Sequence, residues 1–236
     1  MPGELLLQLA AEPRRAAILL DVDGTLAPIV ERPEDARIPE ETRQELGRLA
    51  SRYALVACVS GRAGTDVGRL VGVPGVAVVG EHGLELAPEA AAWADRVAEF
   101  ASGVDWPAER KSLSVSFHFR RAEDEAAARA YLTRVEEAAR AEGLVPRWGR
   151  MVLEVRPPVE AHKGTAVAAL VQRANVSRAL YAGDDTTDVD AFAGLDGLEL
   201  GVRVAVDSLE APPALLAAAD VVVEGTDGVL AMLREL

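Results

Sequence analysis

Two carboxylates follow one another closely where an apolar run of the sequence ends. Asp21 and Asp23 come after the run 16–20, and Gly24 and Thr25 follow them directly. A short apolar run bounded by turn residues is typical of a strand buried on both faces. Open α/β sheets place their sites at the ends of such strands. Residues two apart in a strand point the same way, so Asp21 and Asp23 could act on one ligand. For this motif alone, a solvated turn with two surface acids is an equal alternative.

The composition limits what kind of protein this can be. The chain has 236 residues, half of them apolar, and a formal net charge of −13. This acidic balance argues against nucleic acid and anionic membrane surfaces as partners. The sequence predicts no signal peptide and no transmembrane span. A single cysteine, Cys58, excludes an intrachain disulfide, so we expect a reducing, cytoplasmic compartment. As a separate expectation, we take the chain to be a monomer.

Apolar runs and helical periodicity alternate at both ends of the chain. Alternating strands and helices predict a parallel sheet with helices packed on it. The predicted strands are 16–20, 54–59, 76–79, 179–183, 202–206 and 221–223, and the predicted helices are 4–11, 40–53, 66–70, 166–173 and 226–236.

The middle of the chain has a different pattern. Residues 113–120 and 150–156 alternate between apolar and polar side chains, which predicts half-exposed antiparallel strands. A helix is predicted over 123–142, with Gly143 at its end. The pair Pro157-Pro158 marks a boundary. The middle segment is therefore a small α/β layer inserted in the parallel core.

Polar groups occur at four separate strand ends or loop starts of the predicted core. They are Asp21 with Asp23, Ser60, Lys163, and the acidic group Asp184, Asp185 and Asp188. Carboxylate oxygens can hold Mg²⁺, while a lysine and a hydroxyl can hold phosphate oxygens. One carboxylate can attack phosphorus, and a second can protonate the leaving oxygen and later activate water. The set indicates metal-assisted phosphoryl transfer.

The order of these motifs resembles the haloacid dehalogenase superfamily of phosphotransferases. The matching segments are D-V-D-G-T (21–25), V-S-G-R (59–62), H-K-G (162–164) and G-D-D-T-T-D (183–188). The resemblance implies an α/β fold: a Rossmann-like parallel-sheet core with a smaller inserted α/β cap domain. It implies that Asp21 is the nucleophile and that Asp23 is the general acid/base, which lends its backbone carbonyl to the metal.

The resemblance also implies the remaining core residues of the site. Ser60 and Lys163 would bind the phosphate and join Asp21 and Asp23 as catalytic residues. Asp185 or Asp188 would support the metal or add a ligand. The implied Mg²⁺ ligands are Asp21, Asp23, Asp184 and Asp185.

A closer resemblance is to the trehalose-6-phosphate phosphatases within that superfamily. It extends over most of the chain through S-G-R (60–62), G-E-H-G (80–83), E-R-K (109–111), H-F-R (118–120) and L-E-V-R-P (153–157). It implies a core over 1–85 and 161–236, and a cap over 86–160 that grips the sugar. The substrate-binding residues implied in this way are Thr25, Gly61, Arg62, Glu81, His82, Glu109, Lys111, Arg120 and Glu154.

Strand parity supports part of this sugar-binding set. Arg120 and Glu154 fall on the polar faces of the two alternating segments. Glu109 and Lys111 have the opposite parity to Arg120. They can share its site only if they precede the strand or a bulge intervenes.

The function implied by the resemblance is a Mg²⁺-dependent phosphatase that releases trehalose from trehalose 6-phosphate, with a small-molecule sugar phosphate as its partner. A phosphatase of another sugar phosphate, such as sucrose, glucosylglycerol or mannosylglycerate phosphate, would carry the same core motifs. A non-catalytic regulatory partner of a sugar-phosphate synthase would have a degenerate site. The intact acids and Lys163 count against that last alternative.

Overall fold

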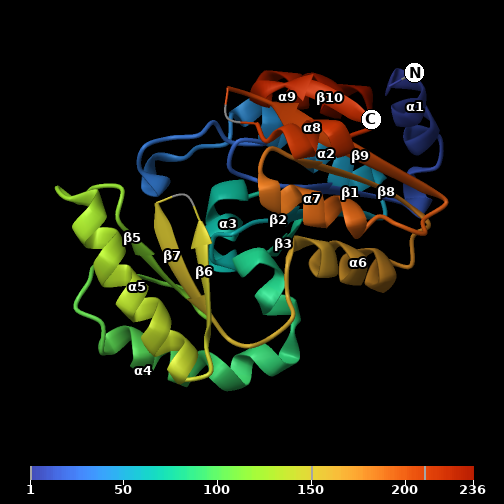
Figure 1. Cartoon of the computed structure of the whole chain (residues 1–236). Helices are drawn as coiled ribbons and strands as arrows, with labels where there is room; N and C mark the ends of the chain where they lie inside the picture. Colours follow the sequence, from blue (N-terminus) through green and yellow to red (C-terminus); the bar gives the residue numbers. More distant parts are fainter. Residues whose placement is uncertain (1, 150, 210) are drawn as a thin grey trace. The chain divides into compact units, whose positions relative to one another are not determined.

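Two compact units make up the chain in the computed structural model, which describes residues 2–149, 151–209 and 211–236. The core unit consists of Met1–Leu86 and Ala161–Leu236, and the insert unit consists of Ala87–Glu160. The insert unit thus interrupts the core unit in the sequence, as the green-to-yellow segment of Figure 1 shows.

The core unit is built on one six-stranded parallel sheet. Its strands are β1 (Ala16–Leu20), β2 (Leu55–Val59), β3 (Ala77–Val79), β8 (Arg178–Gly183), β9 (Leu200–Asp207) and β10 (Val221–Glu224). Their order is β10-β9-β8-β1-β2-β3, and the neighbouring pairs run parallel. β1 is therefore central, with β8 on one side and β2 on the other.

Helices cover both faces of this sheet (Figure 1). They are α1 (Pro2–Ala11), α2 (Glu40–Arg52), α3 (Gly64–Val71), α6 (Lys163–Ala174), α7 (Thr186–Ala193), α8 (Pro213–Ala218) and α9 (Gly225–Glu235). One buried cluster joins the sheet to α1, α2, α3 and α9, and the other joins it to α6, α7 and α8. Burial on both faces explains why the strands read as continuous apolar runs.

Side chains of β1 alternate between the two clusters. Ile18 and Leu20 pack with the cluster of α1, α2, α3 and α9, whereas Ala17 and Leu19 pack with that of α6, α7 and α8. Asp21 lies two residues beyond Leu19, so the strand period directs its side chain toward the second set of helices.

The insert unit is a four-stranded antiparallel sheet with two helices. The strands are β4 (Glu109–Arg110), β5 (Val115–His118), β6 (Val145–Gly149) and β7 (Val152–Arg156), and the helices are α4 (Ala94–Ser102) and α5 (Glu125–Ala141). The strand order is β4-β5-β7-β6. Phe100 of α4 and Leu132 of α5 pack with Phe117 and Leu153 of the sheet, which gives the insert unit its own core.

The predicted fold class, a parallel core with an inserted α/β unit, is confirmed. The strand predicted over 150–156 is observed from Val152, and Arg150 lies outside the described residues. Two strands of the insert unit were not predicted, because β4 has two residues and β6 contains Pro146 and Gly149, which strands disfavour. Cys58 is fully buried in the core. Within the described ranges, no helix has the length and apolarity needed to cross a membrane.

Candidate active site

The carboxylate of Asp21 lies beside the ammonium group of Lys163 at the end of β1. The Asp21 N–H donates to the Ala182 carbonyl oxygen over 2.8 Å, which extends the β1–β8 pairing by one residue. From there Asp21 Oδ1 lies 2.9 Å from Lys163 Nζ, and both side chains are buried. Two residues far apart in the sequence therefore form one ion pair at the sheet edge.

A capping box fixes the start of α6, where Lys163 is the first residue. The His162 imidazole accepts a hydrogen bond from the Gly164 N–H at 3.2 Å. The Thr165 hydroxyl accepts one from the His162 N–H at 3.0 Å. Such reciprocal bonds satisfy N–H groups that the first turn leaves unpaired. The cap holds the backbone from which the Lys163 side chain extends.

Asp188 is completely buried and holds Lys163 from a second direction. Its Oδ1 accepts hydrogen bonds from Lys163 Nζ at 2.7 Å and from the Tyr181 hydroxyl at 2.6 Å. Its Oδ2 accepts from the N–H groups of Asp184 and Asp185, both at 2.9 Å. A carboxylate has about four acceptor positions. These four bonds make Asp188 an anchor for Lys163 and for the turn 184–185.

The carboxylate of Asp184 packs against the turn that follows Asp21. A Cβ atom at Gly24 would come within 2.0 Å of Asp184 Oδ2, and Gly24 has φ of +83°. A glycine is required there both for the left-handed backbone and for the close approach. The segments D-V-D-G-T and G-D-D therefore lie directly against each other.

The acids at this edge fit a divalent cation. Oxygen atoms of Asp21, Asp184 and Asp188 lie within 4.8 Å of one another. Asp184 Oδ1 is buried and lacks a hydrogen-bond partner among the described residues, which is unfavourable unless a ligand supplies one. Three carboxylates face the single ammonium group of Lys163, and hard oxygen donors suit Mg²⁺. Both the oxygen donors and the excess negative charge are thus compatible with a divalent cation.

Burial and mutual repulsion shift the pKa values of these groups. Burial is the main reason why the pKa of Asp21 lies well above its usual range, in spite of Lys163. Burial, followed by the charge of Asp188, raises the pKa of Asp184 to about 7. Burial alone would lower the pKa of Lys163, but Asp188 and Asp21 hold it above its ordinary value. A bound cation would relieve the shifts of the two acids.

The carboxylate of Asp23 is held by Arg62 rather than by the acids of this cluster. Arg62 Nε and Nη2 each donate to one oxygen of Asp23 at 2.7 Å. Arg62 Nη1 donates to the Pro33 carbonyl oxygen at 2.8 Å. The structure therefore places the guanidinium of Arg62, assigned above to substrate binding, on Asp23.

Ser60 and Gly61 form a turn that the segment 80–83 supports. The buried Ser60 hydroxyl accepts from the Arg62 N–H at 3.2 Å, and the Ser60 carbonyl accepts from the His82 N–H at 2.9 Å. A Cβ at Gly61 would lie 2.5 Å from His82 Nε2, so the imidazole packs closely on this turn. Glu81 is fully buried, and both Glu81 and His82 have left-handed φ, of 51° and 54°. Such backbone costs on the order of 1–3 kcal/mol per residue, which the surrounding contacts must offset.

Thr25 and Asp185 have different surroundings. Thr25 is fully buried, and its hydroxyl oxygen has no hydrogen-bond partner within the described part of the chain. Asp185 is exposed and caps α7, where its carboxylate accepts from the Thr186 N–H at 2.6 Å. The Thr25 hydroxyl is therefore a donor that no described residue uses, whereas the Asp185 carboxylate binds the start of α7.

Three of the predicted sugar-binding residues gather on the sheet of the insert unit. Glu109 lies opposite Ser116, and Ser116 lies opposite Glu154, so Glu109 and Glu154 lie in one row across β4, β5 and β7 with Ser116 between them. Lys111 Nζ is 3.2 Å from Glu154 Oε1, and Glu109 Oε2 is 2.7 Å from His118 Nε2. Because β4 is a separate strand ahead of β5, the parity of Glu109 and Lys111 does not exclude a common face.

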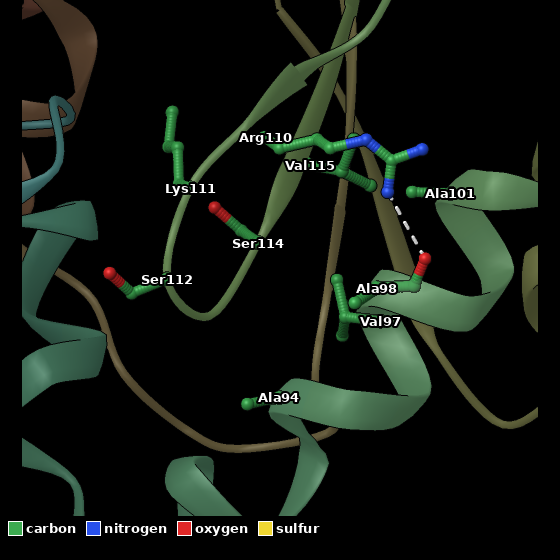
Figure 2. A pocket seen from close by; sticks show the side chains of 9 residues that line it. All are labelled: Ala94, Val97, Ala98, Ala101, Arg110, Lys111, Ser112, Ser114 and Val115. Carbon is green, nitrogen blue, oxygen red and sulfur yellow. Dashed lines mark hydrogen bonds between the residues drawn. The ribbon is translucent and has the colours of Figure 1, made fainter.

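A cavity of about 50 Å³ lies between α4 and the turn that joins β4 to β5 (Figure 2). Arg110 donates to the Ala98 carbonyl oxygen at 3.1 Å, and in Figure 2 it points toward α4 whereas Lys111 points away from it. The cavity can hold only a few water molecules and is too small for a disaccharide. Arg120 lies in an exposed turn after β5.

Tyr181 and Glu85 support the site but were not predicted. The Glu85 carboxylate accepts from the N–H groups of Gly64 at 2.7 Å and Gly80 at 2.9 Å, which ties the start of α3 to the end of β3. A tyrosine in a buried strand needs a partner for its hydroxyl, and that requirement could have singled out Tyr181. No comparable signal in the sequence singles out Glu85.

Comparison with known proteins gives the family. The family model described as Trehalose-phosphatase matches residues 19–107 and 106–214. The chain belongs to the trehalose-phosphatase family. The trehalose-phosphate phosphatases of Mycobacterium marinum and Mycobacterium avium are 36% and 37% identical to it over 86% and 78% of this chain. The chain spans only 58% and 52% of the length of those two relatives.

Solved structures share the fold. The C-terminal domain of the C. albicans trehalose-6-phosphate phosphatase matches with a TM-score of 0.75 and 24% identity, over 99% of this chain and 95% of that one. The Aspergillus fumigatus trehalose-6-phosphate phosphatase matches with a TM-score of 0.65 and 25% identity, over 98% and 96% of the two chains. The core with its inserted α/β unit is thus the architecture of solved members of the family.

Proposed function

We propose that this chain is a Mg²⁺-dependent phosphatase that hydrolyses trehalose 6-phosphate to trehalose and phosphate through an aspartyl-phosphate intermediate. Family membership supports the activity and the substrate. The observation that carries the mechanism is the convergence of Asp21, Lys163 and Asp184 at one edge of the sheet. In this proposal Asp21 is the nucleophile, Lys163 the cation that binds the phosphate and Asp184 a metal ligand.

In the first half-reaction an Asp21 oxygen attacks phosphorus, and the bond from phosphorus to the sugar oxygen breaks. The electron pair of that bond goes to the sugar oxygen, which takes a proton from the Asp23 carboxyl group. Lys163 and the hydroxyls of Ser60 and Thr25 hold the non-bridging phosphate oxygens. The buried, unpartnered hydroxyl of Thr25 supports this role.

In the second half-reaction water attacks phosphorus and gives its proton to the Asp23 carboxylate. The bond between phosphorus and Asp21 breaks, and its electron pair returns to the Asp21 carboxylate. Lys163 remains charged throughout, because its two carboxylate partners hold its pKa above the ordinary value. The ammonium group therefore offsets negative charge on the phosphoryl group in both halves.

Mg²⁺ would be held by the carboxylates of Asp21 and Asp184. When bound, it would neutralise charge on the phosphoryl oxygens. Asp188 contributes from behind by fixing the backbone of Asp184 and Asp185. Asp23 would add its backbone carbonyl, since Arg62 binds its side chain.

The insert unit would recognise the sugar. Glu109, Lys111 and Glu154 combine acceptors and a cationic donor on one sheet face, a set suited to sugar hydroxyls. Arg120 would join them from the exposed turn after β5.

Phosphate release from a panel of sugar phosphates, with Mg²⁺ and with EDTA, tests the proposal. The panel contains the 6-phosphates of trehalose, sucrose and glucose, with p-nitrophenyl phosphate as a simple ester. We expect turnover that is highest with trehalose 6-phosphate and is lost in EDTA. Highest turnover with another sugar phosphate would contradict the proposed substrate but not the proposed mechanism. No phosphate release from any ester would indicate a non-catalytic partner.

The compartment and assembly are also proposed. We propose a cytoplasmic location, supported by the single cysteine, Cys58, which excludes an intrachain disulfide. We propose a monomer, which sedimentation equilibrium of the purified chain would test.

A further inference from the structure

Arg62 makes an unusually complete contact with Asp23. Its Nε and Nη2 bind the two oxygens of that carboxylate in parallel, each at 2.7 Å. Its third nitrogen, Nη1, binds the Pro33 carbonyl oxygen at 2.8 Å. The Arg62 backbone is fixed as well, because its N–H donates to the Ser60 hydroxyl and its carbonyl accepts from the Glu81 N–H. A rigid fork is therefore built against one carboxyl group.

Such a fork fixes orientation as well as charge. Two parallel N–H···O bonds hold the plane of the carboxylate, which a lysine or a single donor could not do. The fork uses two of about four acceptor positions on Asp23 and leaves the others for a proton or a water molecule. About a third of the Asp23 side chain is exposed, so those positions are accessible.

The same contacts commit most of the Arg62 guanidinium to protein oxygens. All three guanidinium nitrogens already donate to protein oxygens, two to Asp23 and one to Pro33. The fork on Asp23 and the bond to Pro33 use three of the five guanidinium N–H groups, so any contact of Arg62 with phosphate could leave the fork in place. The group that the fork serves is Asp23, the acid and base of the proposed reaction.

We propose that Arg62 is a positioning residue that acts through Asp23 on proton transfer to the sugar oxygen that leaves phosphorus. The inference rests on the proposed function, because it takes Asp23 as the general acid. Arg62 holds the carboxyl group so that one oxygen faces the leaving oxygen. The same fork stabilises the carboxylate that remains after the proton has been given.

Leaving groups of different basicity test this role. An alkyl alcohol needs a proton as it leaves phosphorus, whereas p-nitrophenolate leaves without one. The assay measures kcat/KM of Arg62→Ala for trehalose 6-phosphate, for β-glycerophosphate and for p-nitrophenyl phosphate. This ratio covers the steps up to the first product, so water attack in the second half-reaction does not contribute.

We expect Arg62→Ala to lower kcat/KM for the two alkyl esters by about 10- to 100-fold, a part of what general acid catalysis contributes. The loss with p-nitrophenyl phosphate should stay below about threefold. Arg62→Lys should fall close to Arg62→Ala, since a point charge lacks the fork. Arg69→Ala, which removes an exposed arginine paired with Asp66 on α3, is the matched control and should leave all three values unchanged.

A double-mutant cycle with Asp23→Ala completes the test. In that background, Arg62→Ala should cause no further selective loss with the alkyl esters, because the group that it positions is gone. Equal losses on alkyl and aryl esters, or an equal selective loss without Asp23, would overturn the proposal. Faster turnover of alkyl esters by Arg62→Ala would overturn it too, because Arg62 would then restrain Asp23. The glycerol ester keeps the test independent of which sugar the wild type prefers.

Discussion

Removal of the Lys163 charge should destabilise the core unit strongly in the absence of metal. The ammonium group lies 2.9 Å from Asp21 and 2.7 Å from Asp188, and its side chain is 2% exposed. In Lys163→Met the methylene stem is replaced with little change in volume, but the buried carboxylates lose their counter-charge. Breaking a buried ion pair in this way costs about 3–5 kcal/mol in the free energy of unfolding. For a chain of this size, the melting temperature should fall by about 6–20 °C.

Thermal melts at pH 8 in EDTA measure this effect. Arg69→Ala, an exposed ion-pair variant, should stay within about 0.5 kcal/mol of the wild type. The double variant Lys163→Met with Asp188→Asn should recover much of the lost stability, since it removes a buried charge together with its partner. It should not recover activity, because no cation would face the phosphate. A Lys163→Met protein that melts with the wild type in EDTA would refute the electrostatic reasoning.

The remaining predictions concern the metal and the sugar. Because burial raises the pKa of Asp184 to about 7, the folded protein holds that proton more tightly than the unfolded chain. In EDTA the melting temperature of the protein should therefore rise as the pH falls from 8 to 6. With saturating Mg²⁺ the melting temperature should instead fall over the same pH range. A melting temperature in EDTA that does not change with pH would contradict the raised pKa of Asp184. Gly24→Ala would place a Cβ 2.0 Å from Asp184 Oδ2, so it should weaken Mg²⁺ binding at least tenfold by calorimetry. Glu154→Ala should raise KM for trehalose 6-phosphate far more than for p-nitrophenyl phosphate, and an equal effect on both would remove it from the sugar site.

Much of the core could be predicted from the sequence because its strands are buried on both faces. A five-residue apolar run such as 16–20 is typical of a strand inside a sheet, and the polar residues that end such a strand then lie at the sheet edge. The parallel direction of the strands also follows from alternating strands and helices. The strand pattern therefore predicts Asp21 and Asp184 at one edge, and the family resemblance of the segment H-K-G adds Lys163.

The pairing of Asp23 with Arg62 could not be predicted in the same way. It depends on how the turn after β1, the loop at Pro33 and the turn after β2 meet, and loop geometry has no periodic signal. The short strand that carries Glu109 was missed for a related reason, because two residues are too few to show alternation. The bond from the Tyr181 hydroxyl to Asp188 could not be predicted either, because the apolar ring of a tyrosine is enough to explain its place in a buried strand.

Identification of the phosphorylated residue tests the central claim most directly. Asp23→Ala lacks the base for the second half-reaction, so with p-nitrophenyl phosphate it should accumulate the aspartyl phosphate. After acid quench and digestion with pepsin at acidic pH, where an acyl phosphate survives, we expect one phosphoryl group, at Asp21, on the peptide that contains the end of β1. The double variant Asp21→Asn with Asp23→Ala should carry no phosphoryl group. A phosphoryl group on any other residue, or rapid turnover without a covalent intermediate, would contradict the account.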